Sequence, residues 1–221
     1  MLPTLPALVS PRETALLVME CQRGVLEPEE DRFRALADAV AKQGTVEHIR
    51  RLVAAARTVG TPVVFLTASR RADRKGSAFN CPLLAAGSAA TSMVPGSDRH
   101  AMVPGLEPRP EDFVVDRMHG VSPFHSTGLD PLLRNLGVRT VVATGVSVNV
   151  GILGLVLEAV NFGYYAVIPR DAVAGVPEEY VDQVFRFTLR HLAIVTTVDA
   201  IVDLWQPPGP VTNAAIKTVS E

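Results

Sequence analysis

The 221-residue chain lacks most features of extracellular, membrane and nucleic-acid-binding proteins. It has two cysteines, Cys21 and Cys81, which are too few for a disulfide framework and predict a reducing, cytoplasmic location. No apolar run could cross a bilayer without meeting a charge, proline or glycine, and the first residues lack the pattern of a signal peptide. The formal net charge of −2 argues against binding to nucleic acid or to an anionic membrane.

What remains is the composition of an ordinary globular protein, with 48% hydrophobic and 20% charged residues. The length suits one well-packed domain and does not require two. We expect a single domain whose core spans about residues 13–205, with residues 1–12 and 207–221 as terminal arms. Residues 68–111 form a long, proline-rich connection with one short helix expected near 82–86, which is typical of a functional or mobile segment.

Short apolar runs rich in β-branched residues are typical of parallel strands that are buried on both faces. Such runs predict six strands, at residues 15–19, 63–67, 113–116, 139–144, 165–168 and 194–198. Helical spacing predicts helices near residues 46–59, 130–136 (with Asp130 as N-cap), 150–162 and 178–192. This alternation favours an α/β three-layer sandwich with a doubly wound, mostly parallel sheet.

Glu20, Arg117 and Gly151 each follow a predicted strand, Gly151 after a short turn. The carboxyl ends of parallel strands meet at one edge of the sheet, where ligands bind in open α/β folds. The helix expected after Asn149 points free N–H groups and a partial positive charge at the same edge. A side chain at position 151 would therefore stand where a nucleophile or an oxyanion is well supported. The residue there is glycine.

Four short motifs, in matching order, resemble those of the isochorismatase-like (cysteine hydrolase) superfamily. They are residues 15–22, similar to an apolar run followed by Asp, Met and Gln; residues 122–124, similar to Ser-Ala-Phe; residues 144–151, similar to a Thr-Gly-Val…Cys turn; and residues 169–172, similar to a late Asp-Ala motif. The resemblance covers roughly residues 13–205 and implies a Rossmann-like fold of the isochorismatase type. It also implies a cis peptide bond between Val146 and Ser147.

Most members of this superfamily cleave amides with an Asp–Lys–Cys triad. The resemblance places the Asp at Glu20, the Lys at Met118 and the Cys at Gly151. A covalent thioester route needs a thiolate, and glycine has no side chain. We therefore expect a divergent member that lacks the catalytic Cys and Lys and is not a cysteine-dependent amidase.

One branch of the superfamily, the isochorismatases, also has glycine at this position. These enzymes hydrolyse a vinyl ether: the acidic residue protonates the enol carbon, and water adds to the oxocarbenium ion. Gly151 is compatible with that route, and Glu20 would be the acid. The isochorismatases keep the Lys, however, whereas this chain has Met118. The adjacent Arg117 could bind a substrate carboxylate, although strand alternation is expected to turn it away from the site.

Further candidates surround this edge. Cys21 is an alternative nucleophile, but it should point away from Glu20, which favours a buried structural thiol. His119 and His125 are candidates for a base, although loop histidines are more often solvated, and Asn149 is typical of a helix N-cap. The residues expected to bind substrate are Gln22, His119, Phe124, Ser147 and Asn149. Scattered histidines and the absence of the nicotinamidase Asp-x-His pattern predict no metal and no other cofactor.

The predicted helix over residues 150–162 is apolar nearly all round, so both of its sides should be covered. The chain's own sheet would cover one side and a second subunit the other, which predicts a homodimer or larger assembly. Two functions remain open. The first is hydrolysis of a small molecule, in one option a carboxylated one, with Glu20 as general acid or base. The alternative is a catalytically silent family member that binds a metabolite or a protein partner.

Overall fold

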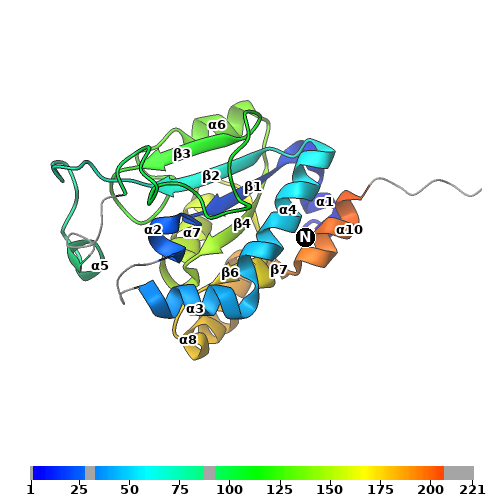
Figure 1. Cartoon of the computed structure of the whole chain (residues 1–221). Helices are drawn as coiled ribbons and strands as arrows, with labels where there is room; N and C mark the ends of the chain where they lie inside the picture. Colours follow the sequence, from blue (N-terminus) through cyan, green and yellow to red (C-terminus); the bar gives the residue numbers. More distant parts are fainter. Residues whose placement is uncertain (1, 28–32, 87–92, 207–221) are drawn as a thin grey trace, which may run out of the picture.

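The computed structural model describes residues 2–27, 33–86 and 93–206. Within them, seven parallel strands form one sheet with helices on both faces, which confirms the expected three-layer α/β architecture (Figure 1). The strand order is β3-β2-β1-β4-β5-β7, and β6 pairs with β4. The strands are β1 (Thr14–Met19), β2 (Val63–Ala68), β3 (Phe113–Arg117), β4 (Thr140–Val146), β5 (Tyr165–Pro169), β6 (Val173–Ala174) and β7 (Ile194–Thr196).

The two central strands, β1 and β4, are buried along their whole length. Their continuous apolar runs are what a strand needs when helices cover both faces. Met19 pairs with Gly145, so both strands approach the same edge of the sheet. Glu20 is the next residue after Met19 and lies at this edge.

The sheet has one strand more than the six predicted. The additional strand, β6, has two residues, and it pairs Val173 and Ala174 with the end of β4. Two residues are too few to show an alternating or continuous apolar pattern. The 3-10 turn at Arg170–Ala172 brings this segment beside β4. The pairing depends on the folded arrangement of the two segments and not on a local sequence pattern.

The helices at the predicted positions are present, and others that were not expected occur in the described residues as well. The predicted ones are α4 (Thr45–Val59), α5 (Pro82–Ala86), α6 (Leu129–Asn135), α7 (Leu153–Asn161) with a π turn before it (Val148–Ile152), and α8 (Glu178–Val184), which continues through a π segment (Phe185–Leu189) into α9 (Arg190–Leu192). The unexpected ones are α2 (Arg23–Leu26), α3 (Arg34–Gln43) and α10 (Val198–Trp205). Helix α10 buries Val198, Ile201 and Trp205 at the helical spacing i, i+3, i+7. The helix has only eight residues, so the pattern is not repeated along the chain.

The N-terminal segment, expected as a terminal arm, contains a helix and packs against the domain at its end. It includes α1 (Leu5–Leu8), and Leu8 and Val9 are 3% and 1% exposed. The Nε1 atom of Trp205 donates to the carbonyl oxygen of Val9 at 2.7 Å, so α10 holds this segment against the domain. The predicted C-terminal arm, residues 207–221, lies outside the described residues.

Helix α6 begins two residues earlier than the sequence suggested, and Gly128 is its N-cap rather than Asp130. Asp130 lies in the first turn, where its carboxylate pairs with Arg134 at 3.0 Å and accepts a hydrogen bond from the Tyr164 hydroxyl at 2.9 Å. The carboxylate is therefore occupied by side chains and does not cap the helix.

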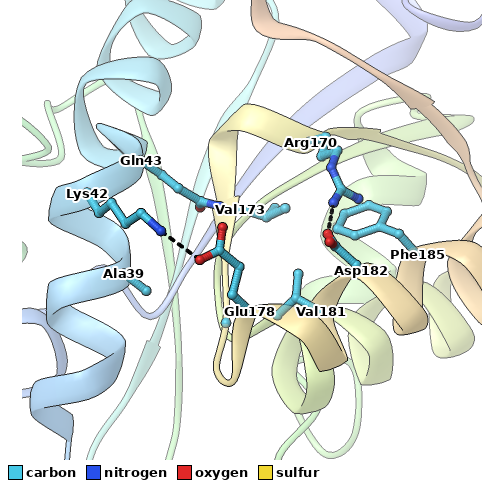
Figure 2. Close-up of a pocket in the computed structure, with 10 residues that line it drawn as sticks. Ala39, Lys42, Gln43, Arg170, Val173, Glu178, Val181, Asp182 and Phe185 are labelled. Atoms are coloured by element: carbon cyan, nitrogen blue, oxygen red, sulfur yellow. Dashed lines mark hydrogen bonds and ion pairs between the residues drawn. The ribbon is translucent and has the colours of Figure 1, made fainter.

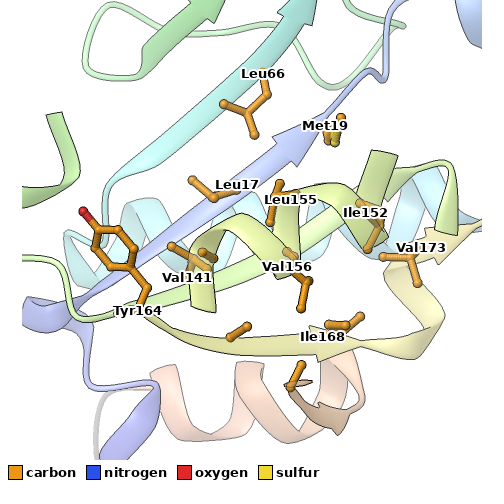
Figure 3. Close-up of a cluster of buried hydrophobic side chains, with 14 of the residues drawn as sticks. Leu17, Met19, Leu66, Val141, Ile152, Leu155, Val156, Tyr164, Ile168 and Val173 are labelled. Atoms are coloured by element: carbon orange, nitrogen blue, oxygen red, sulfur yellow. The ribbon is translucent and has the colours of Figure 1, made fainter. Parts of the chain in front are cut away.

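The sheet separates two apolar layers. One lies against α6 and α7, where Leu17, Met19, Leu155 and Val156 are fully buried (Figure 3). The other lies against α4 and α10 and includes Cys21. No helix in the described part of the chain has the length and apolar character needed to span a membrane. Met19 ends β1 within the first layer, and its side chain reaches the turn that contains Gly151.

Candidate functional site

Glu20 lies directly after β1, at the carboxyl edge of the sheet. Its backbone φ is 52°, in the left-handed region that residues other than glycine rarely adopt. Its amide donates to the carbonyl oxygen of Leu66 at 2.9 Å, so the residue stays attached to β2. Such conformations cost about 1–3 kcal/mol and are concentrated at functional sites. Here the conformation interrupts strand alternation, and the Glu20 carboxylate meets the end of β3.

Arg117, the last residue of β3, forms an ion pair with Glu20. Its Nη2 atom donates to Oε1 of Glu20, and the two side chains are 6% and 21% exposed. The expectation that strand alternation turns Arg117 away was wrong. Along β3 the more covered residues are Phe113, Val115 and Arg117, so the arginine lies on the face that packs against the core.

Met118, which the family resemblance placed at the lysine position, does not approach Glu20 in this way. The residue is 41% exposed and lies beyond the end of β3. It lines a small cavity together with Arg117 and His119. The cation beside Glu20 is therefore supplied by Arg117, one residue earlier in the chain.

Gly151 is buried in the π turn that precedes α7. A Cβ atom there would lie 2.9 Å from Met19 Cε and 3.0 Å from the carbonyl oxygen of Val146. The thioether of Met19 thus fills the space that a nucleophilic side chain would need. The turn contains a cis peptide bond between Val146 and Ser147, which confirms that expectation.

Two residues expected to bind substrate are engaged within the protein. Gln22 is fully buried: its Nε2 donates to the carbonyl oxygens of Ala68 and His100 at 3.0 and 2.9 Å, and its Oε1 accepts from the Ala68 amide at 2.8 Å. Phe124 is 3% exposed and stacks on Phe162, with ring centroids 5.3 Å apart. The Gln22 amide therefore joins the end of β2 to the segment that contains His100, and Phe124 lies in the core.

The other predicted contacts have different environments. Ser147 is the N-cap residue of the π turn, and Asn149 lies within that turn, so Asn149 is not the predicted N-cap. Asn149 Oδ1 is buried and has no hydrogen-bond partner among the described residues. His119 lines two neighbouring cavities, and His125 lines the larger one.

The cavities next to Arg117 give this edge of the sheet a binding volume. The smaller is about 30 Å³ and includes Arg117, Met118 and His119 in its wall. The larger is about 530 Å³, within the usual range for small-molecule sites, and its wall includes His119 and His125. Among the described residues, no group of three or more His, Cys, Asp or Glu side chains could hold a metal ion.

Sequence reasoning missed a hydrogen-bond network around the Asp116 carboxylate, which includes Ser69 of the small cavity. Asp116 accepts hydrogen bonds from the hydroxyls of Thr67 and Ser69 and from His100 Nε2, the first at 2.7 Å and the last at 3.1 Å. Ser69 is 2% exposed, follows β2 directly and also lines the small cavity. The strand-end rule that identified Glu20 applies equally to Ser69 and could have found it.

A third cavity, of about 250 Å³, lies between α3 and α8 (Figure 2). Two ion pairs line it, Lys42–Glu178 at 2.7 Å and Arg170–Asp182. The Arg170 guanidinium also lies 4.3 Å from the Phe185 ring centroid. These charges satisfy one another at exposed positions, where ion pairs contribute little, so this cavity is a weaker candidate than the one beside Arg117.

Cys21 has the properties of a structural thiol. The residue is 1% exposed, and its Sγ donates to the carbonyl oxygen of Met19 at 3.6 Å. Burial, and secondarily the charge of Glu20, raises the pKa of Cys21 to about 12. Cys81 is also a free thiol but is only half-buried, and it lines the larger cavity.

We therefore expect Cys21 to resist alkylation in the folded protein while Cys81 reacts. The folded-state pKa of Cys21 lies above its ordinary value of 9.0, so the stability it contributes is complete below pH 9.0 and is lost as the pH rises toward 12. Iodoacetamide labelling near pH 8, read by mass spectrometry with and without urea, measures both thiols. Labelling of Cys21 in the native protein at the rate of Cys81 would contradict the assignment.

Residues 14–200 match the family model described as the isochorismatase domain. One relative, the ureidoacrylate amidohydrolase RutB of Agrobacterium fabrum (strain C58), is 24% identical over 223 residues, covering 94% of this chain and 96% of the relative. The match extends over nearly the full length of both proteins.

Solved structures agree in fold. A cysteine hydrolase from Pseudomonas syringae pv. phaseolicola 1448A aligns with a TM-score of 0.76 at 22% identity, covering 89% of this chain and 93% of the other. N-carbamoylsarcosine amidase from Thermoplasma acidophilum aligns with a TM-score of 0.66 at 24% identity, covering 85% and 97%. At these identities the solved structures show the common fold and no more.

Proposed function

This chain belongs to the isochorismatase family, and from that premise we propose that it is a hydrolase in which Glu20 acts as general acid or base without a cysteine nucleophile. The observation that carries the proposal is the Glu20–Arg117 ion pair at the carboxyl edge of the sheet. Gly151 stands where the family resemblance places the nucleophile, and Met19 fills the adjacent space. A covalent thioester at position 151 lacks the sulfur atom that it needs.

The ion pair suggests how Glu20 enters the reaction. Arg117 is a permanent cation, and its Nη2 atom donates to Oε1 of Glu20. For an amide substrate, the Glu20 carboxylate accepts a proton from water as the water attacks the carbonyl carbon, and the proton is returned to the leaving nitrogen when the C–N bond breaks. A vinyl ether requires the opposite order: Glu20 in its acid form first protonates the enol carbon, and water then adds to the oxocarbenium ion and returns a proton to Glu20. Arg117 stabilises the negative charge that develops beside it.

The names of two similar proteins, ureidoacrylate amidohydrolase and N-carbamoylsarcosine amidase, both denote amide hydrolysis. Ureido and carbamoyl amides are therefore reasonable substrates to test beside the vinyl ethers that glycine at position 151 favours. Water is the nucleophile for both bond types, at the carbonyl carbon of an amide or at the oxocarbenium ion that forms when a vinyl ether is protonated. Neither route requires a covalent intermediate with the protein.

A catalytically silent member is the second candidate, and a specific observation favours it. The Glu20 carboxylate is already paired, and Gln22 is committed to backbone partners. Met19 occupies the space next to Gly151. In this alternative the cavity beside Arg117 binds a metabolite or a partner without chemistry.

A substrate panel separates the two candidates. Purified protein and the Glu20→Gln variant are each incubated with isochorismate, a simple vinyl ether, nicotinamide, ureidoacrylate and N-carbamoylsarcosine. Turnover by the wild type that disappears in the variant supports the hydrolase. Turnover that survives in the folded variant removes Glu20 from the mechanism. Silence of the wild type across the panel favours the binding protein.

We also propose that the chain forms a homodimer or a larger assembly in a reducing compartment, in keeping with its two free thiols. The sheet covers Leu155 and Val156 of α7, but Leu157 and Val160 are 42% and 39% exposed in the single chain. A second copy would cover this outer side. Sedimentation at micromolar concentration should show a species of twice the chain mass or more, and a monomer would refute the assembly.

A further inference from the structure

Arg117 has more hydrogen-bond donors than the described residues use. Its guanidinium carries five N–H groups in one plane. Glu20 is bound through Nη2, whereas Nε and Nη1 are buried and have no acceptor within the described ranges. The whole residue is 7% exposed. Leaving donors of a buried cation unpaired is costly, so this position is suited to a further acceptor, preferably an anionic one.

The cavity that Arg117 lines has the size and charge for such an acceptor. Its volume of about 30 Å³ matches the space that one water fills in the liquid, or a small planar group. Arg70 lines the cavity as well, and none of the described residues in its wall is acidic. Two arginines thus line the cavity, and the carboxylates that contact its wall from outside are Glu20, at Arg117, and Asp116, at Ser69.

A larger ligand body also has a place. The cavity of about 530 Å³ shares Ser77, Leu84, His119 and Gly120 with the small one, so the two are neighbouring parts of one cleft. Its remaining wall includes Asn80 and His125, which can exchange hydrogen bonds with polar substituents. A molecule that fills both parts would have an anionic end at Arg117 and a mixed polar and apolar body.

We propose that Arg117 anchors the carboxylate of a small organic acid, with the acid group in the small cavity and the rest of the molecule in the larger one. The proposal uses the same site as the proposed hydrolase and specifies its substrate class. Arginine suits this role because its planar fork matches a carboxylate, whereas a lysine offers only a point charge. With Glu20 and the ligand on different N–H groups of one guanidinium, the substrate is held beside the general acid or base.

Binding of benzoate and benzamide tests the proposal without requiring turnover. The two probes have nearly the same shape and differ in charge. Benzoate should bind the wild type at least about tenfold more tightly than benzamide, as expected for charge-assisted hydrogen bonds. The Nε–H resonance of Arg117 should shift when benzoate is added. Equal affinities, no binding of benzoate, or a resonance that does not move would each overturn the proposal.

Three variants complete the test. Arg117→Met should abolish the preference for benzoate, Arg117→Lys should lose most of it, and Val114→Thr, on the exposed face of the same strand, should leave it unchanged. Since Arg117→Met leaves Glu20 unpaired and can unfold, the double variant Glu20→Gln/Arg117→Met is measured with it. A benzoate preference that persists in either folded variant lacking Arg117 would refute the anchor. Inorganic phosphate that displaces benzoate at equal concentration would show a general anion site and would also refute it.

Glu20→Gln distinguishes failure of this proposal from failure of the proposed hydrolase. That variant should lose turnover but still bind benzoate, because Arg117 and its unpaired N–H groups remain. Retained turnover would refute the role of Glu20 and leave the anchor intact. Loss of benzoate binding in folded Glu20→Gln would refute the anchor, whatever the activity of the wild type.

Discussion

Replacing Gly145 by alanine should destabilise the protein by about 4 kcal/mol or more, near the upper end of single-residue effects. A Cβ atom at this position would lie 2.1 Å from the carbonyl oxygen and 2.8 Å from the amide nitrogen of Met19, which are both backbone atoms of β1. Its φ of 106° is also strained for any residue with a side chain. Overpacking and backbone strain each contribute about 1–3 kcal/mol, and neither β1 nor β4 can move without separating the centre of the sheet.

Urea unfolding of wild type and variant at 25 °C measures this loss. Gly154→Ala is the matched control, because a Cβ atom there meets Ser122 Cβ at 3.7 Å in ordinary contact. Its position inside α7 should make alanine neutral or stabilising by up to about 1 kcal/mol. A free energy of unfolding for Gly145→Ala within about 1 kcal/mol of the wild-type value would contradict the close approach of β1 and β4 at Met19 and Gly145.

The close approach also has a functional meaning. Met19 pairs with Gly145 and fills the space beside Gly151, and the next residue is Glu20. A shift of β1 at Met19 would therefore move Glu20 together with the Met19 side chain that fills the space beside Gly151. The stability of the central strand pair and the geometry of the site depend on the same few backbone atoms.

Most of the fold could be predicted because its strands are simple. The strands β1, β2 and β4 each contain a short run of consecutive apolar residues, and a strand buried on both faces is typically rich in such residues. The edge strand β3 is different. Phe113, Val114 and Val115 are all apolar, so the sequence does not indicate which alternate residues face the core. Packing covers Phe113 and Val115 and leaves Val114 51% exposed, and this places Arg117 inward.

The strand-end rule located the site but could not say which side chains are available to a ligand. Glu20 and Arg117 were found because each follows or ends a strand. Gln22 was expected to bind substrate and belongs to the motif at the end of β1, yet its amide is used by Ala68 and by His100, a residue 78 positions away. Hydrogen bonds of such sequence separation form only once the chain has folded, and no local pattern indicates them.

The position of Gly151 is a similar case. Glycine there excludes a covalent intermediate on that residue, which was evident from the sequence. Whether the space was open for a water or filled was not, because Met19 lies 132 residues earlier in the chain and its thioether reaches the turn from the neighbouring strand. The candidate chemistry therefore depends on the ion pair between Glu20 and Arg117 and not on a side chain at position 151.

The second large effect is expected on activity: Glu20→Gln should lower kcat/KM at least about 100-fold on any substrate that the wild type turns over. Glutamine keeps the length of the side chain and can still accept a hydrogen bond from Arg117 Nη2, but it cannot carry a proton to or from the substrate. Removing the charge beside a buried arginine should cost about 1–3 kcal/mol of stability, so unfolding curves must accompany the kinetics.

Glu20→Asp is the informative companion, because it keeps the charge and shortens the side chain by one methylene. If Glu20 is the proton carrier and Arg117 positions the substrate, the aspartate variant should retain measurable turnover with the greater loss in kcat, while benzoate binding at Arg117 is unchanged. If Glu20→Gln were as active as the wild type, a different group would have to transfer the proton. The same conclusion would follow if Glu20→Asp were as inactive as Glu20→Gln and both variants had lost benzoate binding. The ion pair would then be a structural feature of the sheet edge and not part of the chemistry.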